Sequence, residues 1–90
     1  MPHIEFTSQL AQHVDCPPGR NVDASSLSEA LEIVFAEHPQ LRGYVLDDQG
    51  AIRKHIAVFV DGEMLHQRDQ LDVPVSRSSE IFVMQALSGG

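Results

Sequence analysis

The sequence ends on Gly89-Gly90, which places a terminal carboxylate on two residues without side chains. Glycine has no Cβ, so it can pass through a narrow protein channel and adopt backbone angles that other residues rarely reach. Such an ending suits a carboxylate that is delivered into the active site of a second protein. Chain ends also fray without any function, so the segments before this pair must decide between the two interpretations.

The two residues before the glycine pair fit a short projecting segment. Ser88 is small enough to pass the same channel. Leu87 either packs where the segment leaves the fold or inserts into the partner. We therefore expect a folded domain over residues 1–86 and a flexible C-terminal tail over residues 87–90.

Other residue types that often do chemistry are scattered along the chain. The five histidines are His3, His13, His38, His55 and His66, and no two of them have the close helical spacing of a zinc site. Cys16 stands alone beside Pro17 and is interpreted as a passive loop thiol. We expect neither a metal site nor a catalytic residue in this chain.

The charge of the chain narrows the class of partner. Thirteen acidic residues against six basic ones give a formal net charge of −7. Nucleic acids and anionic membranes attract clustered Lys and Arg, so neither is an expected partner. Excess acid favours a partner with a basic docking surface, although it serves solubility equally well. The 90 residues suffice for one domain with one core.

Three observations lead us to expect a cytoplasmic protein. A lone cysteine fits a reducing compartment. The segment MPHIEFTSQL lacks the basic start and apolar core of a secretory signal. No run approaches the roughly twenty apolar residues of a membrane span.

Two strands are predicted near the N-terminus. His3–Thr7 alternates polar and apolar residues, which is typical of a strand with one buried face. Arg20–Asp23 indicates a short second strand that pairs with the first as a hairpin. A helical turn near Leu10 and the breaker cluster Cys16–Gly19 lie between them.

The main helix has the clearest pattern in the chain. Ser26 and Glu29 fit a capping box, in which Ser26 accepts a hydrogen bond from the amide of Glu29 and Glu29 reaches back. Apolar residues then recur at helical spacing, and Pro39 ends the helix near Glu37 or His38. This apolar stripe consists of Leu27, Ala30, Leu31, Val34 and Phe35.

In the second half of the chain we predict a short helical turn at Leu41–Leu46, a loop turn at Asp47–Gly50 and a strand at Ile56–Val60. A tight turn at Asp61-Gly62 then leads to a short return strand at Glu63–His66. Leu71–Val75 is a loop that can hold a helical turn, and Glu80–Ala86 is the final strand. Ile56–Val60 is apolar on both faces, as expected of a strand inside a sheet.

The order of these elements predicts an α+β fold. One main helix packs across one face of a mixed sheet of four to five strands. The helix supplies the crossover that lets the first and last strands lie parallel at the sheet centre. This arrangement is the β-grasp, or ubiquitin-like, fold.

The predicted sheet leaves three large apolar side chains on its open face. We expect Ile56, Val58, Ile81 and Val83 to face the helix. Strand alternation would then turn Phe59, Phe82 and Met84 away from it. A patch of this kind is typical of a partner-binding surface. A covering loop, or scattered exposure without function, would explain the same residues.

Three segments carry a resemblance to a known family. Val58–Glu63 resembles the family's central strand and its V-x-V-N-G-E turn. Ser78–Met84 resembles its D-x-V-x-I-x-P strand, and Ala86–Gly90 resembles its A-V-A-G-G tail. With the element order, these segments make the chain similar to the MoaD/ThiS family of ubiquitin-like sulfur-carrier proteins.

The resemblance implies that the chain is a carrier cosubstrate and not an enzyme. A ubiquitin-activating-type adenylating enzyme would use ATP and magnesium to convert the Gly90 carboxylate into an acyl-adenylate. A sulfur donor would displace AMP and leave a thiocarboxylate, which would pass sulfur to a downstream biosynthetic enzyme. The chain itself would bind no cofactor. Molybdopterin, thiazole and cysteine synthesis all stay open as the receiving pathway.

Two other functions fit the same residues. In a ubiquitin-like protein modifier, the activated tail would form an isopeptide bond to a lysine of another protein. In a β-grasp binding module, the tail would have no chemistry at all.

Overall fold

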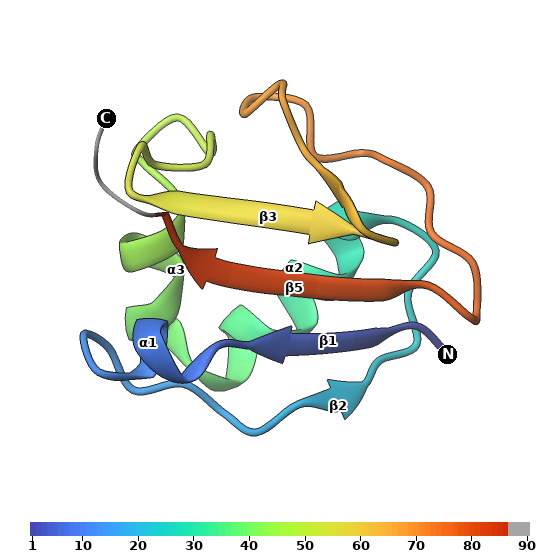
Figure 1. Cartoon of the computed structure of the whole chain (residues 1–90), viewed down its shortest axis with the longest axis horizontal. Helices are drawn as coiled ribbons and strands as arrows, with labels where there is room; N and C mark the ends of the chain where they lie inside the picture. The colour runs from blue at the N-terminus through green and yellow to red at the C-terminus, as the bar shows by residue number, and fades with distance from the viewer. Residues whose placement is uncertain (87–90) are drawn as a thin grey trace.

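Five strands form one mixed sheet in the order β2-β1-β5-β3-β4 (Figure 1). The computed structural model describes residues 1–86. The strands are β1 His3–Phe6, β2 Arg20–Asn21, β3 Ile56–Val60, β4 Glu63–Met64 and β5 Glu80–Gln85. The predicted strands are confirmed; Ile56–Val60 has the predicted bounds, and the first, second, return and final strands are shorter than expected.

The pairing of the strands is that of the predicted β-grasp arrangement. β1 and β5 run parallel beside each other, with Ile4 opposite Ile81. The other pairs are antiparallel: β1 with β2, β3 with β5 and β3 with β4. β5 therefore lies between β1 and β3 in the middle of the sheet, which makes the last strand of the chain an interior one.

Helices accompany this sheet, and the two longer ones lie against one of its faces (Figure 1). They are α1 Ser8–Ala11, α2 Leu27–Glu37 and α3 Pro39–Val45. The predicted single turn from Leu41 is too short, because α3 already starts at Pro39. A proline fits the first turn of a helix, where its missing N–H has no partner to lose. Within residues 1–86, none of the helices has the length and apolar content that crossing a membrane needs.

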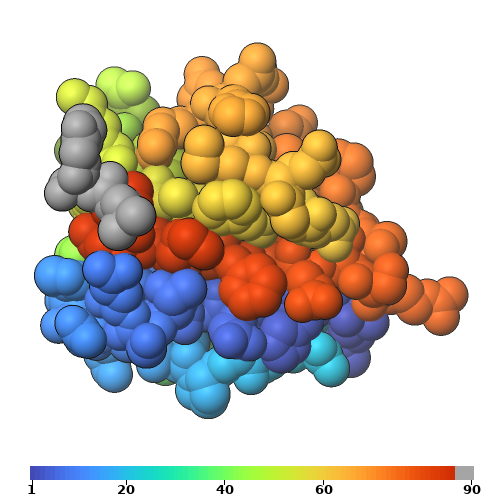
Figure 2. Space-filling model, viewed as in Figure 1, coloured from blue at the N-terminus to red at the C-terminus, as the bar shows by residue number. Residues whose placement is uncertain are grey.

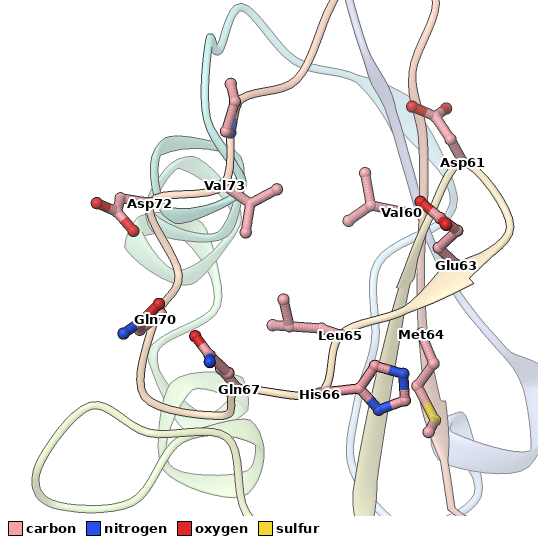
Figure 3. A pocket seen from close by; sticks show the side chains of 11 residues that line it. Val60, Asp61, Glu63, Met64, Leu65, His66, Gln67, Gln70, Asp72 and Val73 are labelled. Carbon is pink, nitrogen blue, oxygen red and sulfur yellow. The ribbon is translucent and has the colours of Figure 1, made fainter.

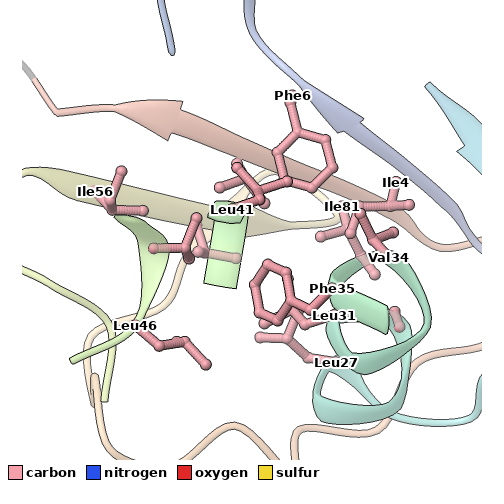
Figure 4. Close-up of a cluster of buried hydrophobic side chains, with 14 of the residues drawn as sticks. Ile4, Phe6, Leu27, Leu31, Val34, Phe35, Leu41, Leu46, Ile56 and Ile81 are labelled. Carbon is pink, nitrogen blue, oxygen red and sulfur yellow. The ribbon is translucent and has the colours of Figure 1, made fainter. Parts of the chain in front are cut away.

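The core lies between α2, α3 and the inner face of the sheet (Figure 4). All five residues of the predicted α2 stripe are buried, and the sheet contributes Ile4, Ile56, Val58, Ile81 and Val83. Leu41, Val45 and Leu46 close the core from the side of α3. This burial confirms which face of each strand points toward the helices.

The start of α2 differs in one detail from the predicted capping box. Ser26 Oγ accepts a hydrogen bond from the Glu29 amide at 3.1 Å, as expected. The Glu29 carboxylate reaches one residue further back and accepts from the Ser25 amide at 2.7 Å and the Ser25 hydroxyl at 2.8 Å. These bonds to Ser25 hold the pKa of Glu29 below its ordinary value.

The segment Leu71–Val75 forms a loop without the helical turn that it could have held. Its carbonyl groups are used by α2, because Leu71 accepts from the Ser28 amide and Val73 from the Leu27 amide, both at 2.8 Å. The first amides of a helix have no partner within the helix. An extended loop that supplies carbonyls to them is therefore favoured over a turn that would use them itself.

Candidate functional site

The open face of the sheet carries the three predicted partner-binding residues. Phe59 lies opposite Phe82 on neighbouring strands, and Ala57 lies opposite Met84. The three large side chains are half-buried, while their strand neighbours Val58 and Val83 are buried in the core. β5 and β3 lie side by side across this face (Figure 2). The prediction of an apolar outer face is confirmed, and its role in binding stays a prediction.

Met64 extends this apolar face beyond the predicted residues. It lies opposite Phe59 in the β3–β4 hairpin, and 43% of its surface is exposed. The sequence holds the signal that would have found it. A two-residue turn at Asp61-Gly62 pairs Val60 with Glu63 and therefore Phe59 with the next residue. We call Phe59, Met64, Phe82 and Met84 the apolar face.

Polar residues of β1 and β2 border the apolar face. Glu5 lies beside Phe82 in the parallel pair, and the ring of His3 lies next to Glu5. His3 Nδ1 is 3.1 Å from Asn21 Oδ1, and its Nε2 is 3.2 Å from Glu5 Oε1. The bond to Asn21, followed by that to Glu5, raises the pKa of His3 above its ordinary value of 6.5. This border therefore gains positive charge in mildly acidic solution.

The last strand leads toward the predicted reactive end of the chain. β5 ends at Gln85, which lies opposite Ile56, the first residue of β3. The Ala86 amide then donates to the His55 carbonyl at 2.8 Å. The predicted tail and sulfur-accepting terminus lie outside the described residues: Leu87, Ser88, Gly89 and Gly90. The fold thus brings the chain to residue 86 beside the start of β3.

An open cleft of about 520 Å³ lies at the opposite end of β3. It separates the β3–β4 hairpin from the loop that follows β4. Val60, Leu65 and Val73 point into it, as Figure 3 shows. Asp61 and Glu63 contribute carboxylates to its rim. The cleft lies far along β3 from Ala86, so it does not adjoin the predicted reactive end.

Residue types associated with metal or thiol chemistry do not gather in the described part of the chain. Among residues 1–86, no three His, Cys, Asp or Glu side chains lie close enough together to hold a metal ion. Cys16 is half-buried in the loop after α1. Burial, followed by the charge of Asp15, raises the pKa of its thiol. A raised pKa reduces the thiolate fraction and hence the reactivity of the sulfur.

Sequence comparison places most of the chain in a known family. Residues 18–90 match the ThiS family. The matched range includes all of β2 to β5 and the last four residues of the chain. No curated protein sequence matches the chain significantly.

Solved structures share the whole fold at low sequence identity. The crystal structure of SAMP1 from Haloferax volcanii is 24% identical, with a TM-score of 0.75 over 99% of this chain and 98% of that chain. A chain of the BexX/CysO complex from Amycolatopsis orientalis is 16% identical, with a TM-score of 0.79 over 100% of both chains. The small archaeal modifier protein 1 from Methanosarcina acetivorans is 16% identical, with a TM-score of 0.75 over 99% of this chain and 95% of that chain. These likenesses show that the fold is the ubiquitin-like β-grasp fold.

Proposed function

Because the chain belongs to the ThiS family, we propose that it is a ubiquitin-like sulfur-carrier protein that receives sulfur on the carboxylate of Gly90. The family match supports this proposal more than any other observation, because it spans the last strand and extends to Gly90. The chain acts as a cosubstrate and supplies no catalytic group. Its part in the reaction is to present a carboxylate and a surface by which another protein holds it.

The proposed chemistry has two steps. A carboxylate is a poor electrophile until one of its oxygens becomes part of a good leaving group. An adenylating enzyme transfers AMP from ATP to the Gly90 carboxylate and releases pyrophosphate, with magnesium handling the phosphate charge. The sulfur of a donor then attacks the acyl carbon and AMP leaves. With sulfide as the donor, loss of the remaining S–H proton leaves the chain ending in a thiocarboxylate, which passes sulfur to a downstream biosynthetic enzyme.

The position of β5 supports this use of the C-terminus. Ala86 leaves the sheet at the end of an interior strand, with its amide bonded to His55. Four further residues, fully extended, span at most about 14 Å. The carboxylate can therefore enter a partner's active site only if the partner docks close to this end of the sheet.

The apolar face supplies a surface for that docking. Phe82 and Met84 lie on the same strand that ends at Gln85, and Phe59 lies beside them on β3. Large aromatic side chains carry much of the binding energy in protein interfaces. The net charge of −7 further favours a partner whose docking surface is basic. One strand thus links the proposed docking surface to the proposed reactive end.

Intact-mass spectrometry tests the proposal directly. The chain is incubated with the ThiS-type adenylating enzyme of the same organism, ATP, magnesium and sulfide as the donor. Replacement of one oxygen by sulfur should add about 16 Da, the mass difference between the two atoms. Deletion of Gly90 should abolish the shift, because the chain then ends one residue short of the site of activation. An unchanged mass with the wild-type chain and an enzyme shown to bind it would contradict the proposal.

A protein modifier is the second candidate, because three of the matched solved structures are of small archaeal modifier protein 1, also called SAMP1. The same activated carboxylate would then be attacked by a lysine amine and form an isopeptide bond. Arg77 is the last basic residue of the chain, so trypsin would leave residues 78–90 attached to the target lysine. Peptides with this branch in cell extracts would identify a modifier.

A chain extended beyond Gly90 that still functioned would instead identify a binding module without tail chemistry.

A further inference from the structure

Three ring side chains from three separate segments form a cluster next to the end of β5. Tyr44 comes from α3, His13 follows α1, and His55 directly precedes β3. The rings of Tyr44 and His55 meet edge to face, with centroids 4.8 Å apart and an angle of 75°. The rings of His13 and Tyr44 are nearly parallel, with centroids 6.4 Å apart and an angle of 14°. Tyr44 therefore packs edge to face on His55 and has the His13 ring nearby.

This cluster makes hydrogen bonds to the last two described residues of the chain. The Tyr44 hydroxyl donates to Gln85 Oε1 at 3.3 Å, and this bond is partly buried. The His55 carbonyl accepts from the Ala86 amide at 2.8 Å. One bond holds the side chain of residue 85 and the other holds the main chain of residue 86. The root of the C-terminal segment is thus fixed at two neighbouring points.

The segment that carries His55 is itself well anchored. The Arg53 amide donates to the Val45 carbonyl, and Arg53 Nε donates to the Gly43 carbonyl, both at 2.9 Å. Arg68 donates to the carbonyls of Arg53 at 2.6 Å and Ile56 at 2.8 Å. The Arg53 bonds tie the approach to β3 to α3, and the Arg68 bonds tie it to the loop after β4, so Tyr44 and His55 belong to one connected support.

The imidazole of His55 acts in this support by packing. Its Nε2 is buried and has no hydrogen-bond partner within residues 1–86. The polar group by which His55 orders the end of β5 is therefore its main-chain carbonyl. The ring provides the surface against which Tyr44 is aligned.

We propose that Tyr44 is a positioning residue that, through its hydroxyl bond to Gln85, holds Gln85 and Ala86 in place at the end of β5. This inference rests on the proposed function for its consequence in activation. Gly90 is only four residues from Ala86, so a less well-ordered Ala86 widens the range of positions that the Gly90 carboxylate can reach. Misplacement of a reacting group by about 1 Å already slows a reaction strongly. The bond from Tyr44 to Gln85 reduces the motion at this point of the chain.

The proposal separates positioning from docking. The apolar face lies on the open side of the sheet and determines how tightly a partner holds the folded body. Tyr44 and Gln85 determine what fraction of bound chains presents its carboxylate in the right place. Loss of the Tyr44 hydroxyl should therefore lower kcat for activation and leave KM unchanged.

The test uses Tyr44→Phe, which removes the hydroxyl and keeps the ring. Amide hydrogen exchange at Ala86, followed by NMR, should become about three- to tenfold faster. The kcat for adenylation should fall by a similar factor. Gln85→Met should have the same two effects, and the double variant should be no worse than either single one, because one bond is lost in all three. Gln67→Ala, in the cleft at the other end of β3, serves as the matched control and should change neither value.

Two results would overturn the proposal. The first is unchanged exchange at Ala86 in Tyr44→Phe, since the hydroxyl would then not order the end of β5. The second is a raised KM at constant kcat, which would place Tyr44 in docking. Failure of the wild-type chain to be activated would count against the proposed function instead. The exchange measurement would still decide whether Tyr44 holds the root of the segment.

Discussion

Asp61 holds two parts of the sheet together from an unusual backbone conformation. Its φ of 52° lies in the left-handed region, which Asp and Asn tolerate better than most residues with a Cβ. Its carboxylate accepts from the hydroxyl of Ser79 and from the amide of Glu80, both at 2.9 Å. Ser79 is buried, with 3% of its surface exposed. Asp61 thus connects the β3–β4 turn to the start of β5.

The substitution Asp61→Ala should therefore be costly. It leaves the buried hydroxyl of Ser79 with one acceptor fewer and places a residue with no local hydrogen bond in a left-handed turn. We expect a loss of about 1–3 kcal/mol in the free energy of unfolding, measured by urea denaturation. Asp61→Asn keeps an acceptor oxygen and the tolerance for positive φ, so it should cost less. Equal losses in the two variants would contradict this explanation.

Asp47 makes stability depend on pH in acid. The amides of Ala51 and Gln49 donate to its carboxylate at 3.0 and 2.9 Å, and these bonds hold its pKa below the ordinary value of 3.8. A carboxyl group whose pKa is lowered by folding stabilises the fold above its ordinary pKa. That contribution is lost as the pH falls through the lowered pKa. Stability should therefore decrease as the pH is taken below about 4.

The variant Asp47→Ala isolates this contribution. It lacks the titrating carboxylate, so its melting temperature should fall less steeply than that of the wild type between about pH 4 and pH 2. Asp48→Ala changes the exposed neighbouring residue and serves as the control. Thermal melts followed by circular dichroism give the two slopes. A slope for Asp47→Ala as steep as the wild-type slope would show that other groups account for the loss in acid.

At the scale of elements, the start of α2 depends on a short network of serines. Ser26→Ala removes the side-chain acceptor of the Glu29 amide and should cost about 1 kcal/mol of unfolding free energy. Ser28→Ala lies two residues later, where the amide is already bonded to Leu71. It should change the free energy by no more than about 0.5 kcal/mol, because alanine is a good helix former. Chemical denaturation of the pair measures the difference, and equal losses would exclude a capping role for Ser26.

Local patterns predicted most elements because their signals lie within a few residues. The α2 stripe has helical spacing, and Asp61-Gly62 marks a turn that the backbone angles confirm. The length of α3 was underestimated, because Pro39 both ends one helix and begins the next. Glu29 bonds to Ser25 instead of the cap residue itself, a choice that the spacing of a capping box does not determine.

At the scale of the whole molecule, the sequence could predict the apolar face of the sheet but not the cluster around Tyr44. Alternation in β3 and β5 places Phe59, Phe82 and Met84 on one face, and the register confirms it. The contact between Tyr44 and Gln85 joins residues 41 positions apart. No periodicity relates them, since only the docking of α3 beside the end of β5 brings them together. The predicted role of Gly90 lies beyond the described residues and depends on the family match.

The proposed docking surface and the proposed reactive end lie in different parts of the chain. This separation gives a prediction for the molecule as a whole. Among residues 1–86 the buried core extends from Ile4 to Val83, so we expect a chain truncated after Ala86 to keep the melting temperature of the full chain. This truncated chain retains the apolar face but has no Gly90. It should therefore inhibit activation of the full chain competitively, with an inhibition constant close to the KM of the full chain.

The same truncated chain with Phe82→Ala tests which surface carries the inhibition. Loss of an aromatic side chain at the centre of an interface typically weakens binding about tenfold or more. Inhibition should weaken by that factor while the melt shows that the variant is folded. Glu37→Ala in the truncated chain, on the exposed side of α2, should leave inhibition unchanged. Inhibition that survives Phe82→Ala would mean that the partner holds the folded body by a surface other than the open face of the sheet.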